Sequence, residues 1–254
     1  MRELLALVWD VARRARGLLV LTVVLSFAAG ILESEVFRVH SIYLEGPRRA
    51  VLEDVRDLLQ GLGPTSTALC PCGAVTQRAR QACRVRDVNL RRRLPHEIYL
   101  YVEPREPAAA LSTPTRPDWY MLADSSGMVY ESVGGPPSRV VQFHAFPADF
   151  LGVGFELQEQ AAVVYADVMA GLEKGGARIR KVDFQDPANI VAFLEDGTKA
   201  KIGGMDNLER KFALLGWIAE EIERKGMRAQ YIDVRIPSQP AVLPREAMAP
   251  AGQS

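Results

Sequence analysis

The stretch "IVAFLEDGTKAKIGG", residues 190–204, decides the fold of the second half of the chain. Apolar and polar residues alternate on both sides of Asp196-Gly197, and an Asp-Gly pair between two alternating runs is a strong β-hairpin signal. The preceding run "RKVDF", residues 180–184, alternates in the same way. The sequence therefore predicts a sheet built around this hairpin.

Helical periodicity follows the hairpin and also precedes it. Residues 205–226 carry an apolar stripe, with Asp206 as the expected N-cap and Glu209 as its capping-box partner. An earlier helix is predicted over about 156–172, and two glycines directly after Lys174 would end it. We expect both helices to cover one face of the sheet.

Further strands are predicted upstream of these helices. "WYMLADSSGMVYE", residues 119–131, indicates two strands joined by an Asp-Ser-Ser-Gly turn, and "RVVQF", residues 139–143, indicates a third. Residues 108–118, "AAALSTPTRPD", are rich in proline and polar residues and predict a hinge loop. The result is a mostly antiparallel β domain over residues 108–240.

The last strand of this domain is predicted over about 229–236. In "YIDVRIPSQPAV", residues 231–242, alternate positions are apolar, and prolines follow at 237 and 240. Residues 241–254 are predicted to form a flexible tail, because they are small and polar. An uncovered edge strand offers backbone groups to a partner chain. The alternative is that residues 241–254 cover the strand themselves.

A smaller domain is predicted over residues 36–105. A strand ending at Gly46 precedes helices over 47–60 and about 74–83. Two strands, "RVRDVNLRR" and "EIYLYVEP", then follow and are joined by Leu94-Pro95. The order strand-helix-helix-strand-strand predicts a compact α+β unit.

The N-terminal region contains an uncharged run over residues 17–32, preceded by three arginines. Sixteen helical residues span roughly 24 Å, somewhat less than a hydrocarbon core of ~30 Å, and Arg16 can lengthen the span by snorkelling. We predict a transmembrane helix over residues 17–33, with residues 1–16 in the cytoplasm. A cleaved signal peptide and a buried core helix are the alternatives.

The three cysteines all lie in the smaller domain, in "CPCGAVTQRARQAC". Outside the cytoplasm, a disulfide between Cys83 and Cys72, or Cys83 and Cys70 instead, is the favoured prediction. A metal site would lack a nearby fourth ligand. Three reduced, inert thiols are the remaining alternative.

The composition gives little support to an enzyme. The 31 basic and 31 acidic residues cancel, which does not indicate nucleic-acid binding. The three histidines lie far apart, and neither a Gly-rich phosphate loop nor a GxSxG motif is found. We therefore expect no catalytic residues, metal, cofactor or small-molecule substrate.

Two regions of the chain resemble the FtsQ/DivIB family of bacterial cell-division proteins. "FRVHSIYLEG" and "VRDVNLRRRLPHEIYLYVEPREPAA" are similar to the POTRA domain of that family. "LEDGTKAKIGG", a helix carrying Lys211, and "IDVRIP" near the C-terminus are similar to its β domain. The matching positions are Phe37, Val39, Ile42, Gly46, Val88, Leu94, Pro95, Ile98, Val102, Glu103, Pro107, Leu194, Asp196, Gly197, Gly203, Lys211, Ile232, Asp233, Arg235 and Pro237.

The resemblance implies a non-enzymatic single-pass protein of the bacterial inner membrane at the division septum. Its bulk would lie outside the cytoplasm, and its last strand would bind FtsB/DivIC-like and FtsL-like partners. The partner-binding residues implied are Tyr231, Asp233, Arg235, Ile236 and Ser238. The alternatives are a POTRA-containing component of protein translocation or envelope assembly, and a secreted hydrolase.

Overall fold

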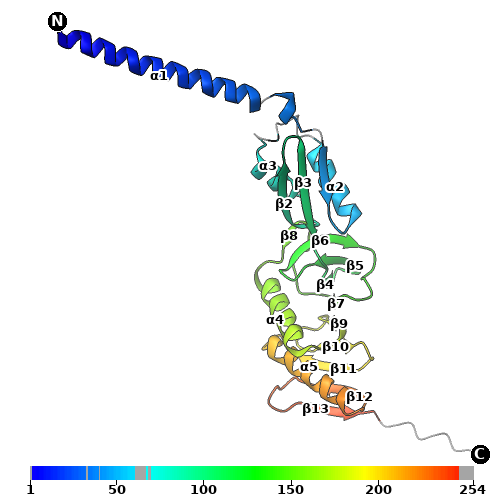
Figure 1. Ribbon diagram of the computed structural model, residues 1–254. Coiled ribbons are helices and arrows are strands. Elements are labelled where there is room, and N and C mark those ends of the chain that lie inside the picture. Colours follow the sequence, from blue (N-terminus) through cyan, green and yellow to red (C-terminus); the bar gives the residue numbers. More distant parts are fainter. Residues whose placement is uncertain (1, 33, 40, 61–66, 68–69, 246–254) are drawn as a thin grey trace, which may run out of the picture. The chain divides into compact units, whose positions relative to one another are not determined.

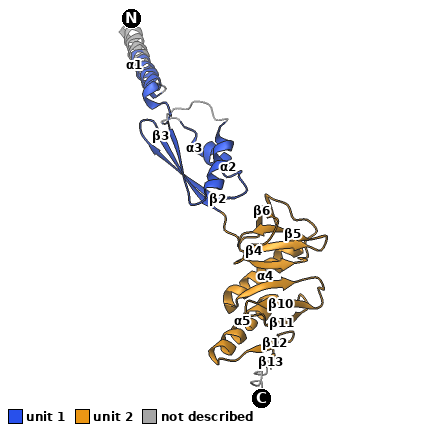
Figure 2. Cartoon of the chain, turned by 90° about the vertical axis from the view of Figure 1, so that its right-hand side faces the viewer, with its two compact units in different colours: residues 1–104 blue, residues 105–254 orange. Residues whose placement is uncertain are grey.

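The computed structural model describes residues 2–32, 34–39, 41–60, 67 and 70–245, and for residues 2–15 only the course of the helix. The chain divides into two compact units, residues 1–104 and 105–254 (Figure 2). Each unit has its own sheet and its own hydrophobic core. The protein is therefore of the α+β class.

The first unit contains a three-stranded mixed sheet. Its elements are α1 (Arg2–Leu32), η1 (Glu35–Phe37), β1 (Ser41–Glu45), α2 (Arg49–Leu59), α3 (Cys72–Ala79), β2 (Val85–Arg93) and β3 (Glu97–Pro104). β3 lies in the middle, parallel to β1 and antiparallel to β2. The predicted order of strand, helix, helix, strand and strand is confirmed.

Alternation along the strands separates the two faces of the small sheet. Val55 of α2 and Leu100 of β3 are fully buried in the core between the helices and the sheet. On the opposite face, Tyr43 and Tyr99 stack with ring centroids 4.9 Å apart. This is the two-faced pattern expected for a sheet covered on one side only.

Helix α1 carries an apolar, exposed stretch over residues 17–32. Within the part of the chain that the structure describes, no helix is both long enough and apolar enough to cross a membrane. The predicted transmembrane helix over residues 17–33 is therefore not confirmed, and residue 33 lies outside the described residues. The uncharged run spans roughly 24 Å, so snorkelling by Arg16 would be needed to reach the thickness of a hydrocarbon core.

The second unit contains a ten-stranded mixed sheet and two long helices (Figure 1). Its elements are β4 (Ala109–Thr113), β5 (Arg116–Ala123), β6 (Met128–Val133), β7 (Val141–His144), β8 (Phe155–Glu156), α4 (Glu159–Gly175), β9 (Ile179–Asp183), β10 (Ile190–Leu194), β11 (Lys199–Gly203), α5 (Leu208–Arg224), β12 (Ala229–Asp233) and β13 (Ala241–Pro244). The strand order is β13-β12-β11-β10-β9-β7-β4-β5-β6-β8.

The predicted hairpin lies inside this sheet, between β12 and β9. β10 and β11 are antiparallel neighbours, and Gly197 in their turn has a φ of +86°. Most strand pairs of this sheet are antiparallel, as predicted, but three pairs are parallel and were not predicted, because the helices were treated only as covers. α4 lies in the connection between the parallel strands β7 and β9, and α5 joins the parallel strands β11 and β12. Parallel neighbours require such crossovers.

The prediction of a hinge loop over residues 108–118 is wrong. β4 lies inside the sheet between β7 and β5, and Ala109, Ala110 and Leu111 are fully buried. Leu111 belongs to a buried row that runs across the register through Phe143, Val182, Ala192, Ala200 and Ile232. The prolines at 114 and 117 lie in the β4–β5 turn and near the start of β5, where they do not interrupt this row.

The predicted capping box at the start of α5 is also wrong. Asn207 precedes the helix with a φ of +52° and makes no side-chain capping bond. Asp206 instead accepts a hydrogen bond from the buried Lys211 ammonium (3.1 Å), which also donates to the Gly204 carbonyl (2.9 Å). Lys211 thereby fixes the turn between β11 and α5.

Glycines allow α4 and α5 to approach each other closely. A Cβ atom added at Gly216 would lie 2.1 Å from the Gly175 carbonyl oxygen, and one added at Gly171 would lie 2.5 Å from the Glu209 carbonyl oxygen. Both obstructing atoms belong to backbone, which cannot rotate away as a side chain can. The crossing therefore depends on the absence of side chains at these positions.

We expect Gly216→Ala to destabilise the protein by about 1–3 kcal/mol, because the overpacked crossing outweighs the helix propensity that alanine adds. Urea unfolding followed by circular dichroism measures the change. Gly134→Ala is the control, since a Cβ atom at Gly134 meets nothing within 4 Å. A Gly216→Ala variant as stable as the parent would contradict this packing.

Candidate functional site

The last strand of the large sheet is β13, not the predicted strand over about 229–236, which corresponds to β12. β12 lies between β11 and β13, and β13 pairs with it in antiparallel register, with Ile232 opposite Val242. The backbone of β12 is therefore already covered by this chain. The prediction of a flexible tail over residues 241–254 is wrong for 241–244, and its part from 246 onward lies outside the described residues.

β13 itself now forms the edge. The Arg245 N–H donates to the Arg228 carbonyl at 2.8 Å, so this amide points toward β12. Successive N–H groups of a strand point to opposite sides. Those of Leu243 and Ala241 therefore also point toward β12, whereas positions 240, 242 and 244 face outward.

Two of the three outward positions lack an N–H group, because they are Pro240 and Pro244. Val242 lies between them and supplies the one outward N–H of these three positions. The carbonyl groups of all three remain as acceptors. Prolines of this kind restrict unspecific sheet extension, as natural edge strands commonly do. The edge can therefore pair only with a strand that fits this single donor.

The five predicted partner-binding residues lie in β12 and in the connection that follows it. Tyr231 and Asp233 lie on β12, facing away from the helices. Arg235 and Ile236 follow the strand and are exposed, as is Ser238 in the turn before β13. The structure thus places Tyr231 beside β13, but it leaves Ile236 and Ser238 in the connection.

Arg235 already has a carboxylate partner in its own chain. Its Nε–H donates to both Asp233 carboxylate oxygens at 3.0 Å, and an Nη–H donates to Oδ2 at 2.7 Å. The Arg235 hydrogen bonds hold the pKa of Asp233 below its ordinary value. The predicted pairing of Arg235 with an incoming carboxylate would have to displace or share this contact.

The uncovered face of the sheet carries a cross-strand row that leads to the edge. Sequence reasoning missed this row, because it depends on the register of strands far apart in the chain. Aromatic and apolar residues alternate with lysines along it. Its members are Gln142, Lys181, Phe193, Lys199, Tyr231 and Leu243.

The neighbouring positions make this face more basic than acidic. The Lys201 ammonium lies 4.1 Å from the centroid of the Tyr231 ring, a cation–π arrangement. Lys181 forms an ion pair with Asp183 (3.1 Å), and Asp233 is held by Arg235. Lys199 is exposed between Phe193 and Tyr231. The face therefore suits a partner segment that combines acidic and apolar side chains.

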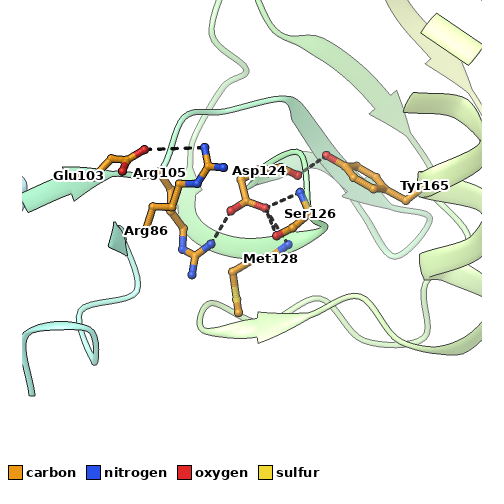
Figure 3. Close-up of polar contacts among 7 residues, drawn as sticks. All are labelled: Arg86, Glu103, Arg105, Asp124, Ser126, Met128 and Tyr165. Carbon is orange, nitrogen blue, oxygen red and sulfur yellow. Dashed lines mark hydrogen bonds and ion pairs between the residues drawn. The ribbon is translucent and has the colours of Figure 1, made fainter. Parts of the chain in front are cut away.

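A second polar cluster lies at the start of the second unit (Figure 3). The Arg105 guanidinium donates to Asp124 Oδ2 at 2.5 Å, and both side chains are largely buried. Asp124 Oδ1 accepts from the Ser126 N–H, the Ser126 hydroxyl and the Met128 N–H. The Tyr165 hydroxyl of α4 donates to the Asp124 carbonyl at 2.7 Å. This cluster ties the first residue of the unit to the β5–β6 turn and to α4.

The hydrogen bonds of this cluster stabilise the charged form of Asp124. Burial alone would raise the pKa of Asp124, but the hydrogen bonds from Ser126, Arg105 and Met128 outweigh it and hold the pKa below its ordinary value. Burial raises the pKa of Tyr165. In the first unit, Arg86 and Glu103 form only a loose, exposed pair at 3.9 Å.

We expect Asp124→Asn to destabilise the protein by about 3 kcal/mol at pH 7, because it leaves the buried Arg105 charge without its carboxylate. The folded-state pKa of Asp124 is lowered, so its contribution is present above the unfolded pKa near 4 and is lost as the pH falls through the folded value. Urea unfolding should therefore show a smaller difference at pH 3. Asp149→Asn, at an exposed carboxyl, is the control; a difference independent of pH contradicts this account.

The predicted disulfide from Cys83 to Cys72, or to Cys70, is not formed, and all three residues are thiols. Cys72 begins α3, whereas Cys83 follows its C-terminal end. Eight helical residues place the two ends roughly 12 Å apart, beyond the ~7 Å limit for Cα atoms in a disulfide. Among the described residues, no group of three or more His, Cys, Asp or Glu side chains is arranged to hold a metal ion.

No protein-family model matches this chain, and no curated protein sequence matches it.

Proposed function

We propose that this protein is a non-enzymatic, membrane-attached scaffold of the bacterial division machinery, of the FtsQ/DivIB type. It would recruit FtsB/DivIC-like and FtsL-like single-span proteins at the septum. The motif resemblance and the order of a small strand-helix-helix-strand-strand unit before a larger sheet unit support the proposal.

The observation that carries the proposal is the edge strand β13. Val242 turns its N–H and carbonyl groups away from β12, so both are available to an added strand. Val242 and Leu243 are about two-fifths exposed, which leaves apolar surface on both sides of that edge. The docking edge is therefore β13, one strand beyond the one predicted from the sequence.

The open sheet face supplies a second contact. Side chains of a partner strand added beside β13 would extend the row formed by Leu243, Tyr231 and Lys199 on neighbouring strands. Acidic residues of the partner would be attracted to Lys199 and Lys201, and its apolar residues would cover Leu243. The charges would orient the partner on this face, whereas the backbone hydrogen bonds to β13 would supply the binding affinity.

Helix α1 supplies the membrane attachment in this proposal. Leu21, Val24 and Phe27 are each more than half exposed, and the stretch around them is uncharged. An all-round apolar helix is disfavoured in water. We place this stretch in the inner membrane, with the N-terminus in the cytoplasm and the chain after residue 33 outside.

Val242→Pro tests the docking edge, because it removes the outward N–H while breaking no hydrogen bond to β12. We expect binding of a purified FtsB/DivIC–FtsL pair to weaken by about tenfold or more, measured by calorimetry. Val242→Thr is the matched control, since threonine keeps the N–H group and the branched shape. Equal affinity of the two variants would refute docking at β13.

The double variant Leu21→Arg/Val24→Arg tests membrane attachment through α1. Each charge costs about 2.5–3.5 kcal/mol near the centre of a membrane-inserted helix. We expect this double variant to leave the membrane fraction of lysed cells, whereas the parent stays there after alkaline extraction. The double variant Glu220→Arg/Glu223→Arg, at two exposed positions of α5, is the control. The same distribution for all three proteins would contradict attachment through α1.

A further inference from the structure

A tight turn joins two of the cysteines in the first unit. The Cys72 N–H donates to the Cys70 carbonyl at 2.8 Å, and Pro71 between them has φ −74° and ψ 74°. These are the features of an inverse γ-turn. In an extended chain, residues two apart are separated by about 7 Å, the limit for bridging by a disulfide. The turn shortens this separation and brings the two side chains together.

The two thiols differ in their surroundings. Cys70 is 3% exposed and packs in the core of the unit, whereas Cys72 is partly exposed at the start of α3. Burial raises the pKa of Cys70, and the neighbouring Cys72 raises it further. Cys70 thus keeps its proton, and Cys72 is the sulfur that a reagent meets first.

Arg92 of β2 contacts both cysteines from the helix-covered side of the small sheet. Its Nε–H donates to the Cys72 sulfur at 2.8 Å, and an Nη–H donates to the Cys70 carbonyl at 3.0 Å. A guanidinium beside a cysteine sulfur favours nucleophilic attack by that sulfur. The second contact holds the turn, so that both sulfurs stay in place.

We propose that Cys70, Cys72 and Arg92 form a thiol–disulfide exchange site that accepts a disulfide as its oxidant. The Cys72 thiolate attacks one sulfur of that disulfide, forming a mixed disulfide and releasing one thiolate. The Cys70 sulfur then attacks the Cys72 sulfur, and the Cys70 proton passes to the second departing thiolate. The protein gains a Cys70–Cys72 disulfide and loses two hydrogens, while the oxidant is reduced to two thiols.

The small ring that a Cys70–Cys72 disulfide would close suits reversible exchange rather than structural cross-linking. A bond between cysteines two residues apart closes a small, strained loop, and strained disulfides are readily reduced. Cys83 plays no part, because α3 separates it from this pair. The site does not depend on the docking edge, so either proposal can fail alone.

Oxidised glutathione is a suitable probe for the reduced full-length protein. Trypsin cleaves after Arg56, Arg78, Arg80 and Arg84, so one peptide contains both Cys70 and Cys72, and another contains Cys83. Mass spectrometry should find the first peptide lighter by two hydrogens. A disulfide between the two peptides, or glutathione added mainly to Cys83, would overturn the proposal.

Single substitutions resolve the order of the steps. Cys70→Ser should stop the reaction at a stable glutathione adduct on Cys72, whereas Cys72→Ser should leave Cys70 unmodified over the same time. Arg92→Gln should slow adduct formation about tenfold in the Cys70→Ser background. Cys83→Ser is the matched control and should react like the parent. Equal adduct formation on Cys70 and Cys72, or an unchanged rate with Arg92→Gln, would refute the assigned roles.

Discussion

The hydrogen-bonding capacity of the backbone at the last strand is the constraint on which the rest of the account depends. A sheet edge always leaves alternate N–H and carbonyl groups without a partner strand. In this protein, Pro240 and Pro244 remove two of the outward N–H groups of β13, and Val242 keeps one between them. The edge is thus protected against unspecific pairing and still open at one position. A partner is selected by how well it fits that position.

The remainder of the second unit holds this edge in place. Parallel pairing of β12 with β11 requires the crossover helix α5, and α5 in turn packs on α4 through glycines. Lys211 fixes the turn that leads into α5, and Asp124 fixes the far side of the unit to Arg105 and α4. Each of these contacts lies outside the edge, and the pairing of β13 with β12 sets the register that turns Val242 outward.

Local signals predicted the parts of the fold that depend on neighbours in sequence. The Asp196-Gly197 hairpin and the helix ending at Gly175 and Gly176 follow from turn and capping chemistry, and both are found.

β4 was missed because Ser112 and two prolines nearby resemble a loop, although the apolar run Ala109–Leu111 is the residue pattern of a buried strand. β13 was missed because three residues between Pro240 and Pro244 are a weak strand signal. The cross-strand row on the open face arises only from long-range register, which no local pattern reports. The γ-turn at Pro71 was likewise missed, because the disulfide prediction rested on the expected location of this domain outside the cytoplasm.

Amide hydrogen exchange at Val242 and Leu243, followed by NMR, tests the central claim most directly. These neighbours have similar exposure and chemistry, but the account gives their N–H groups opposite directions. In the protein alone, the Leu243 amide should be protected and the Val242 amide should exchange freely. Addition of the FtsB/DivIC–FtsL pair should then protect Val242. Protection of Val242 in the protein alone, or its continued free exchange in the complex, would contradict the account.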